Sequence, residues 1–194
     1  MSRRWRWFLA WLLIPLGTCW AGGGDPPAWH GLRPAESIGG PLALVDQRGR
    51  PFRLERLERP LALLAFGYTR CPDICPDTLG VMQQVVSRLP EALRPARLFV
   101  TLDPRHDIPA VLRDYLAWFD EDIVGLSGTP EAVAEVSGRY RVNAVREAEG
   151  HIAHSAYLYL IDARGRVLLL YPHGTAAEAI RADIIALYTR AARR

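Results

Sequence analysis

Two cysteines four residues apart carry the most specific chemical signal in this sequence. Cys71 and Cys75 stand in FGYTRCPDICPDT, after an apolar run at residues 61–66 and before a helical pattern of apolar residues that begins at residue 77. The run predicts a strand covered on both faces, so the sulfurs are expected between a strand end and a helix N-terminus. Backbone amides at such an end favour a thiolate over a thiol. Two thiolates placed there can close a disulfide or hold one soft metal ion.

A purely structural role explains this cysteine pair less well. A disulfide across so short a loop would restrain little of the unfolded chain, because the entropic gain grows with loop length. Pro72 and Pro76 each follow a cysteine and restrict the backbone, so both sulfurs are presented on a stiff loop. The third cysteine, Cys19, lies in the N-terminal segment. We therefore interpret Cys71 and Cys75 as a chemical pair.

Histidine is the obvious third ligand, because a two-sulfur site for Cu(I) usually has one more donor. His154 stands next to a predicted core strand and His151 lies further into a polar stretch, whereas His30 and His173 are expected to face solvent. A structural role is the alternative for both His154 and His151. The chain has two methionines, so a site built on thioethers is excluded.

A polar segment, DPRHD at residues 103–107, follows the second predicted core strand. The carboxyl ends of parallel strands meet at one edge of an α/β sheet, so this segment is expected at the same rim as the cysteine loop. Asp103 is therefore a candidate acid beside the site. The alternative is that the acids of this segment cap the helix that follows.

The elements that would position these residues alternate between strands and helices. Residues 42–54 predict a hairpin. Strands are predicted at residues 61–66, 97–102, 123–126, 155–161 and 166–171, and helices from residue 77, over 108–119, from 130 and from 175. Thr129 is expected to cap the third helix, and Thr175 with Glu178 has the spacing of a capping box for the last. This order predicts an α/β, thioredoxin-like three-layer fold with an extra N-terminal β-hairpin and an insertion before the His-bearing strand.

The first 24 residues predict a signal peptide or a short membrane anchor. Arginines precede an apolar run at residues 7–17, and small, Gly- and Pro-rich sequence follows it. The run is shorter than the roughly 20 apolar residues that span a bilayer. Cleavage after Ala21, lipidation at Cys19 and retention as an anchor stay open. Residues 25–37 are expected to form a linker and residues 38–194 the functional domain.

The body of the protein has no charge surplus that would attract a polyanion. All 24 basic residues of the 194 are arginines, and three of them lie within the first six residues. The remaining 21 arginines balance the 21 acidic residues. Nucleic-acid binding is therefore a poor hypothesis. The length and ordinary composition predict one domain with a tail.

Three segments together resemble the Sco/SenC family, which consists of exported thioredoxin-fold proteins. They are FGYTRCPDICPDTL at residues 66–79, TLDPRHDIP at 101–109 and HSAYLYLIDARGRV at 154–167. Their order and spacing agree with the family over residues 38–190. A CxxxC motif alone would be weak evidence, but its combination with the downstream Asp-Pro and His-Ser segments is highly specific.

The resemblance implies that Cys71, Cys75 and His154 bind copper through two thiolates and one imidazole. Asp103 transfers from the family as an acid beside the site. The sequence departs from the family at residues 105–106, where the family commonly has an acid and then an arginine, whereas this chain has an arginine and then a histidine. The local charge pattern therefore does not transfer.

The function that the resemblance implies is that of a copper metallochaperone for cytochrome c oxidase assembly. Thiolates select Cu(I), and the imidazole could let the site also accommodate Cu(II). Loading is expected to weaken as pH falls, because the ligands must be deprotonated. Expected partners are the copper-containing oxidase subunit and a periplasmic dithiol reductant that keeps the cysteines from pairing. The expected location is the bacterial periplasm, with or without an anchor in the inner membrane.

The alternative function is that of a periplasmic thiol-disulfide oxidoreductase that reduces the cysteine ligands of the oxidase copper subunit. It would use Cys71 or Cys75 as its nucleophile and would need no metal, so His154 would be dispensable. Three residues separate the cysteines, against two in thioredoxins, which disfavours an efficient general reductase. A peroxidase has less support, because nothing beside the cysteines marks a peroxide pocket.

Overall fold

The structure is a computed structural model that describes residues 28–147 and 150–192. The predicted leader at residues 1–24 lies outside the described residues. The strands are β1 (Leu44–Asp46), β2 (Pro51–Phe52), β3 (Leu61–Gly67), β4 (Ala96–Thr101), β5 (Ile123–Ser127), β6 (Ala144–Arg146), β7 (Ile152–His154), β8 (Tyr157–Asp162) and β9 (Val167–Pro172). The helices are α1 (Ile74–Ser87), α2 (Pro109–Leu116), α3 (Pro130–Arg139) and α4 (Ala177–Ala191), with short 3-10 turns at Leu54–Arg56 and Glu91–Leu93.

A seven-stranded sheet with the order β2-β1-β5-β4-β3-β8-β9 forms the middle layer. β3 pairs parallel with β4, and β4 pairs parallel with β5. β8 runs antiparallel to β3 on its other side. β3 is buried along its whole length, as its continuous apolar sequence predicts for a strand covered on both faces.

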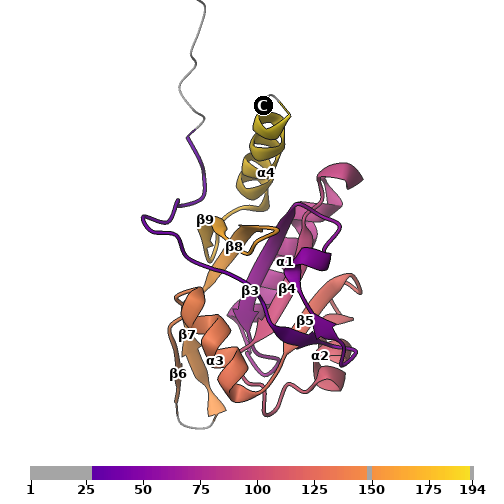
Figure 1. The fold of residues 1–194 in the computed structure, drawn as a ribbon, viewed down its shortest axis with the longest axis vertical. Coiled ribbons are helices and arrows are strands. Elements are labelled where there is room, and N and C mark those ends of the chain that lie inside the picture. The colour runs from indigo at the N-terminus through magenta and orange to yellow at the C-terminus, as the bar shows by residue number, and fades with distance from the viewer. Residues whose placement is uncertain (1–27, 148–149, 193–194) are drawn as a thin grey trace, which may run out of the picture.

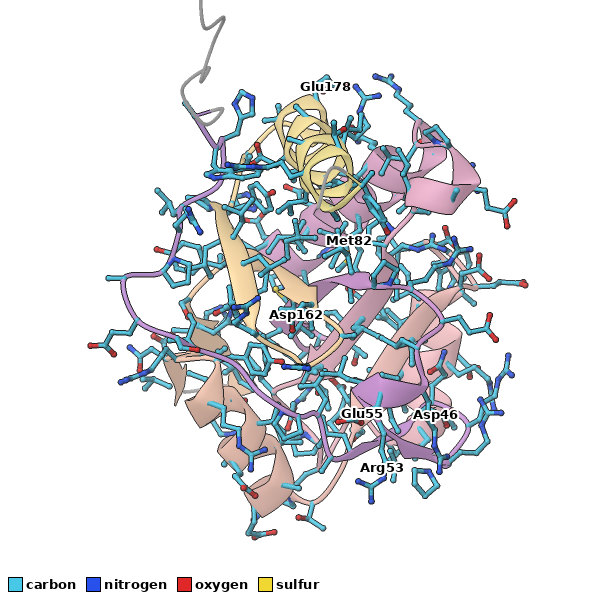
Figure 2. All side chains as sticks on the ribbon, turned by 45° about the horizontal axis from the view of Figure 1, so that its top comes forward. Asp46, Arg53, Glu55, Met82, Asp162 and Glu178 are labelled. Carbon is cyan, nitrogen blue, oxygen red and sulfur yellow. The ribbon has the colours of Figure 1, made fainter. Side chains whose placement is uncertain are left out.

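Helices cover both faces of this sheet. Successive residues of a strand point to opposite faces, so Leu63 and Ala65 of β3 join a core cluster with α1, α2 and α4, while Leu64 and Phe66 join a second cluster with α3. Met82 of α1, labelled in Figure 2, is fully buried in the first cluster. The predicted three-layer α/β fold is therefore confirmed.

The N-terminal hairpin forms as predicted and extends the sheet. β1 pairs antiparallel with both β2 and β5. The Asp46 carboxylate stabilises the turn, since its Oδ1 accepts hydrogen bonds from the backbone N–H groups of Arg48 and Arg50, both at 2.9 Å.

The helix ends differ from the predictions in three helices. α2 ends at Leu116, three residues before the predicted end at residue 119. α1 begins at Ile74 rather than at residue 77, which puts Cys75 within its first turn. The capping box expected at the last helix is wrong, because the Thr175 hydroxyl donates to the carbonyl of Pro172 (2.7 Å) and α4 begins without a side-chain cap. The predicted cap of α3 is confirmed, with Thr129 Oγ1 accepting from Ala132 N–H at 3.2 Å.

The insertion before the last two sheet strands is itself a two-stranded sheet of β6 and β7. His154 is the last residue of β7, and the core strand β8 begins at Tyr157 rather than at Ser155. The histidine therefore belongs to the inserted hairpin and not to the core strand that the sequence predicted. Figure 1 shows this hairpin at the end of the molecule opposite α4.

Part of the predicted linker is held against the sheet. The backbone N–H groups of His30 and Gly31 donate to the buried carboxylate of Asp183 on α4, at 3.1 and 2.9 Å. Leu32 forms an isolated antiparallel bridge with Leu170 on β9. No helix in the described ranges is long and apolar enough to cross a membrane.

Candidate metal centre

The cysteine loop connects the C-terminal end of β3 to α1. The Cys71 N–H donates to the Tyr68 carbonyl at 3.1 Å and closes a turn just after the strand. Cys75 lies in the first turn of α1 and is 3% exposed, whereas Cys71 precedes the helix and is 9% exposed. Both residues carry free thiols. The pair therefore lies at the rim of the sheet, with Cys71 the nearer to solvent.

His154 approaches these thiols from β7. Its Nδ1 lies 3.2 Å from the Ser155 carbonyl, so a proton on Nδ1 leaves the Nε2 lone pair free. Nε2 lies 3.8 Å from Cys75 Sγ. Burial lowers the pKa of His154 by more than the hydrogen bond to Ser155 raises it, and His151 lowers it further. The imidazole is therefore neutral near pH 7, which is the form that binds a metal ion.

Cys71, Cys75 and His154 offer ligand atoms that all lie within 4.8 Å of one another. Bonds of about 2.3 Å to sulfur and 2.0 Å to nitrogen, as for zinc, put the donors of one ion about 4 Å apart. The three donors therefore need to approach by less than about 1 Å to share one ion. Thiolates suit Cu(I), and the imidazole nitrogen suits Cu(II) as well. The structure brings together the three residues that the sequence resemblance assigns as ligands.

Burial opposes the thiolate form that the sequence predicted for Cys75. It raises the pKa of the Cys75 thiol well above its usual range, and the neighbouring Cys71 raises this pKa further. The helix N-terminus therefore does not make Cys75 a thiolate in the metal-free protein, because desolvation outweighs the backbone donors. A bound cation would have to displace the proton from this sulfur.

Two residues that the sequence analysis missed shape the centre. Gly67 leaves space for Cys75, since a Cβ at Gly67 would lie 2.5 Å from Cys75 Sγ. The buried Tyr68 accepts a hydrogen bond from the Ile152 N–H at 3.2 Å, and its ring lies edge-on to His154 with 6.2 Å between centroids. Tyr68 thereby ties the cysteine loop to β7. The signal for both was a glycine and an aromatic residue at the end of a buried strand, shortly before CxxxC.

Asp103 is not in the donor group but connects its two halves. It is 2% exposed and accepts hydrogen bonds from Arg70 Nη2 at 2.7 Å and from Arg146 Nη2 at 2.8 Å. Burial raises its pKa, but the two guanidinium groups outweigh burial and hold the pKa below its usual range. Arg70 precedes Cys71, and Arg146 lies on β6, which pairs with β7. Asp103 therefore fixes the cysteine loop relative to the histidine hairpin.

Asp107 also holds the cysteine loop in place. This buried carboxylate accepts hydrogen bonds from Thr69 N–H (2.9 Å), Thr69 Oγ1 (2.6 Å) and Thr101 Oγ1 (2.6 Å). The alternative that the acids of this segment cap the next helix is wrong, because the N-cap residue of α2 is Ile108 and it makes no side-chain cap. Both acids act on the cysteine loop instead.

The other histidines considered in the sequence analysis lie outside the donor group. His151 is exposed, and its Nδ1 lies 3.0 Å from Glu147 Oε2. His30 and His173 are exposed, as predicted. The structure thus favours His154 over His151 because the end of β7 directs His154 toward Cys75.

Asp103→Asn is expected to loosen the β6–β7 hairpin and to weaken Cu(I) binding by about 10-fold or more, as for the loss of other groups that orient a metal ligand. The amide keeps the shape of the side chain but leaves two arginines without a countercharge. Backbone amide exchange at residues 152–154 and Cu(I) competition titrations measure the two effects.

Asp46→Asn is the matched control for this change, because Asp46 is also a buried acid paired with an arginine but lies on β1, three strands from β3 in the sheet order. Asp46→Asn should leave unchanged both the backbone amide exchange of the β6–β7 hairpin and the Cu(I) affinity. Equal Cu(I) affinity in Asp103→Asn and the wild type would show that Asp103 does not support the centre.

Comparison with known proteins agrees with the resemblance found in the sequence. The family model described as SCO1/SenC matches residues 30–189. An SCO2-like protein of Rickettsia conorii is 36% identical over 138 residues, which is 68% of this chain and 67% of the relative.

Two solved structures with copper bound are similar to this chain. The structure of Bradyrhizobium japonicum ScoI with copper bound has a TM-score of 0.67 and 35% identity, and the match covers 76% of this chain and 98% of that one. The structure of yeast Sco1 with copper bound has a TM-score of 0.71 and 31% identity, with coverage of 79% and 90%. The predicted thioredoxin-like fold is the fold of these neighbours.

Proposed function

The chain belongs to the SCO1/SenC family, and on this premise we propose that it is a copper metallochaperone that delivers copper to cytochrome c oxidase during assembly. The observation that carries this proposal is the donor group of Cys71, Cys75 and His154, whose ligand atoms lie within 4.8 Å of one another. Copper is then cargo rather than a permanent cofactor.

The placement of the donors supports transfer by ligand exchange. Cys71 is the more exposed of the two cysteines, and His154 is half-buried. A donor from a partner could therefore approach the ion from the solvent side and replace Cys71 while Cys75 still holds it. Tyr68, Asp103 and Asp107 keep the loop and the hairpin in place during the exchange, so the vacated centre does not need to be rebuilt.

The proposed function also implies a cellular location and two partners. A solved structure similar to this chain is described as BsSco, a member of the Sco family of cytochrome c oxidase assembly proteins, so the copper-containing subunit of the oxidase would be the receiver. A dithiol reductant would be a second partner, because a Cys71–Cys75 disulfide could not hold Cu(I) in the same way. Residues 1–24 would act as a signal peptide or an anchor and place the domain in the bacterial periplasm, on the outer side of the inner membrane.

The direct test is an anaerobic titration of the reduced protein with Cu(I) against a chromophoric Cu(I) chelator. The proposal expects one tightly bound Cu(I) per chain. The copper-loaded protein should then pass its ion to the metal-free soluble domain of the oxidase copper subunit. Uptake of no stoichiometric Cu(I) would contradict the proposal.

His154→Ala separates the metallochaperone from the oxidoreductase. We expect the variant to lose at least about 10-fold in Cu(I) affinity, since it loses a ligand and not merely a group that orients one. The rate at which glutathione opens the Cys71–Cys75 disulfide should stay the same, because the imidazole is not needed for thiol exchange. Unchanged Cu(I) affinity would contradict the metallochaperone and favour the oxidoreductase, for which His154 is dispensable.

The pKa of Cys75 also bears on this choice. A thiolate is the nucleophile in disulfide exchange, and burial keeps the Cys75 thiol protonated near neutral pH. Cys75 is therefore a poor attacking group in the metal-free state. A soft cation can replace this proton, so burial does not prevent Cys75 from acting as a metal ligand, whereas an oxidoreductase would have to use Cys71 as its nucleophile.

A further inference from the structure

A cavity of about 870 Å³ opens beside the metal centre, between the loop that follows β4, the helix α3 and the strand β6. Figure 1 shows α3 beside the β6–β7 hairpin. Two lining residues connect the cavity to the centre: Arg70 directly precedes Cys71, and Ala144 of β6 pairs with His154 across the hairpin. We call this cavity the α3 groove. Anything bound in it would lie next to the copper ligands.

The inner part of the α3 groove is apolar and carries one unpaired hydroxyl. Leu102, Val133 and Val142 line it. Ser137 also lines it, is 7% exposed, and its Oγ has no hydrogen-bond partner among the described residues. Buried hydroxyls are normally paired, but this oxygen is covered by neighbouring atoms, so a bound segment would meet the apolar side chains first.

The rim of the α3 groove is positively charged. Arg70, Arg105 and Arg146 line it, and Asp103 is the one acid among the described residues that do so. Asp103 is already bonded by Arg70 and Arg146, whose side chains are 47% and 51% exposed and keep donors free. Arg105 makes no ion pair with any described residue. Its positive charge contributes to the lowered pKa of Glu131, but the two side chains form no salt bridge. The surplus is local, because the body as a whole is balanced in charge.

We propose that the α3 groove docks an acidic, partly apolar segment of the protein that receives the copper. Carboxylates of that segment would face Arg105 and the free donors of Arg146, and an apolar side chain would fill the inner part. This proposal rests on the proposed copper transfer and adds the chemistry of the partner. Its effect is on encounter and orientation, because charges at an interface rim act chiefly on the association rate.

The test measures complex formation between the metal-free full chain, in detergent micelles, and the metal-free soluble domain of the oxidase copper subunit. Arg105→Glu is expected to weaken association by about 10-fold at low ionic strength. The difference should shrink in high salt, because exposed charges are screened there. Ala134→Glu, on the exposed face of α3 that lines the groove, should weaken association as well. Both variants should bind Cu(I) as tightly as the wild type.

Arg164→Glu is the matched control, since Arg164 is exposed in the β8–β9 turn, at the opposite end of β8 from His154. It should associate like the wild type. Wild-type association by both groove variants would overturn the proposal. Groove-dependent association in a chain that takes up no Cu(I) would support the groove and overturn the proposed function instead.

Discussion

Cys75→Ser is expected to lower the Cu(I) affinity of the reduced protein by more than about 100-fold. Loss of a group that merely orients a metal ligand costs about 10- to 100-fold, so loss of the ligand itself should cost more. Cys75 is the donor that faces both Cys71 and His154, with 3.8 Å between its Sγ and His154 Nε2. A serine hydroxyl there is a hard donor that does not replace a soft thiolate for Cu(I).

The measurement is a competition titration under anaerobic conditions, with thermal unfolding as the check that the variant is folded. A serine buried at this position costs about 1–3 kcal/mol where its hydroxyl finds no partner, so Cys71→Ser, at the more exposed cysteine, is the second variant. Cys19→Ser is the matched control, because it removes a thiol of the chain outside the pair and should leave Cu(I) affinity unchanged. Wild-type affinity in both Cys71→Ser and Cys75→Ser would exclude a two-thiolate centre.

The two cysteine donors could be predicted because their signal is local in the sequence. The CxxxC motif between an apolar run and a helical pattern placed both sulfurs at a strand end, and β3 forms where that pattern put it, although α1 begins three residues earlier than predicted. His154 was harder, since the residue pattern alone did not exclude His151 three positions earlier. The resemblance to a family favoured His154, and the geometry of the β6–β7 hairpin supplies the physical reason.

The sequence placed Asp103 beside the site, but the partners of Asp103 could not be predicted, because they come from distant parts of the chain. Asp103 meets Arg70 and Arg146, which lie 33 and 43 residues away along the sequence. β6 has three residues, all exposed, and therefore shows none of the alternation that reveals a strand. The pKa of Cys75 is raised, whereas the sequence predicted that the helix N-terminus would lower it. Burial of the first turn of α1 causes this difference, and that burial depends on the packed core rather than on the motif.

Gly67→Ala is expected to weaken Cu(I) binding by about 10- to 100-fold, although Gly67 is not a ligand. A methyl group at this position would lie 2.5 Å from Cys75 Sγ and 3.0 and 3.1 Å from the ring of Phe99. Phe99 is 1% exposed in the core, so the sulfur has to move and with it the spacing to His154. Overpacking of this kind also destabilises a fold by about 1–3 kcal/mol.

Gly80→Ala is the matched control for this last change, since Gly80 lies within α1 and a Cβ there would have no atom within 4 Å. It should bind Cu(I) like the wild type and be more stable by up to about 1 kcal/mol, the difference in helix propensity between glycine and alanine. Competition titration and thermal unfolding of the two variants separate an effect on the centre from an effect on stability. Wild-type Cu(I) affinity in a folded Gly67→Ala would mean that the Cys75 sulfur can shift without cost, and the spacing of the three donors would then not control copper binding.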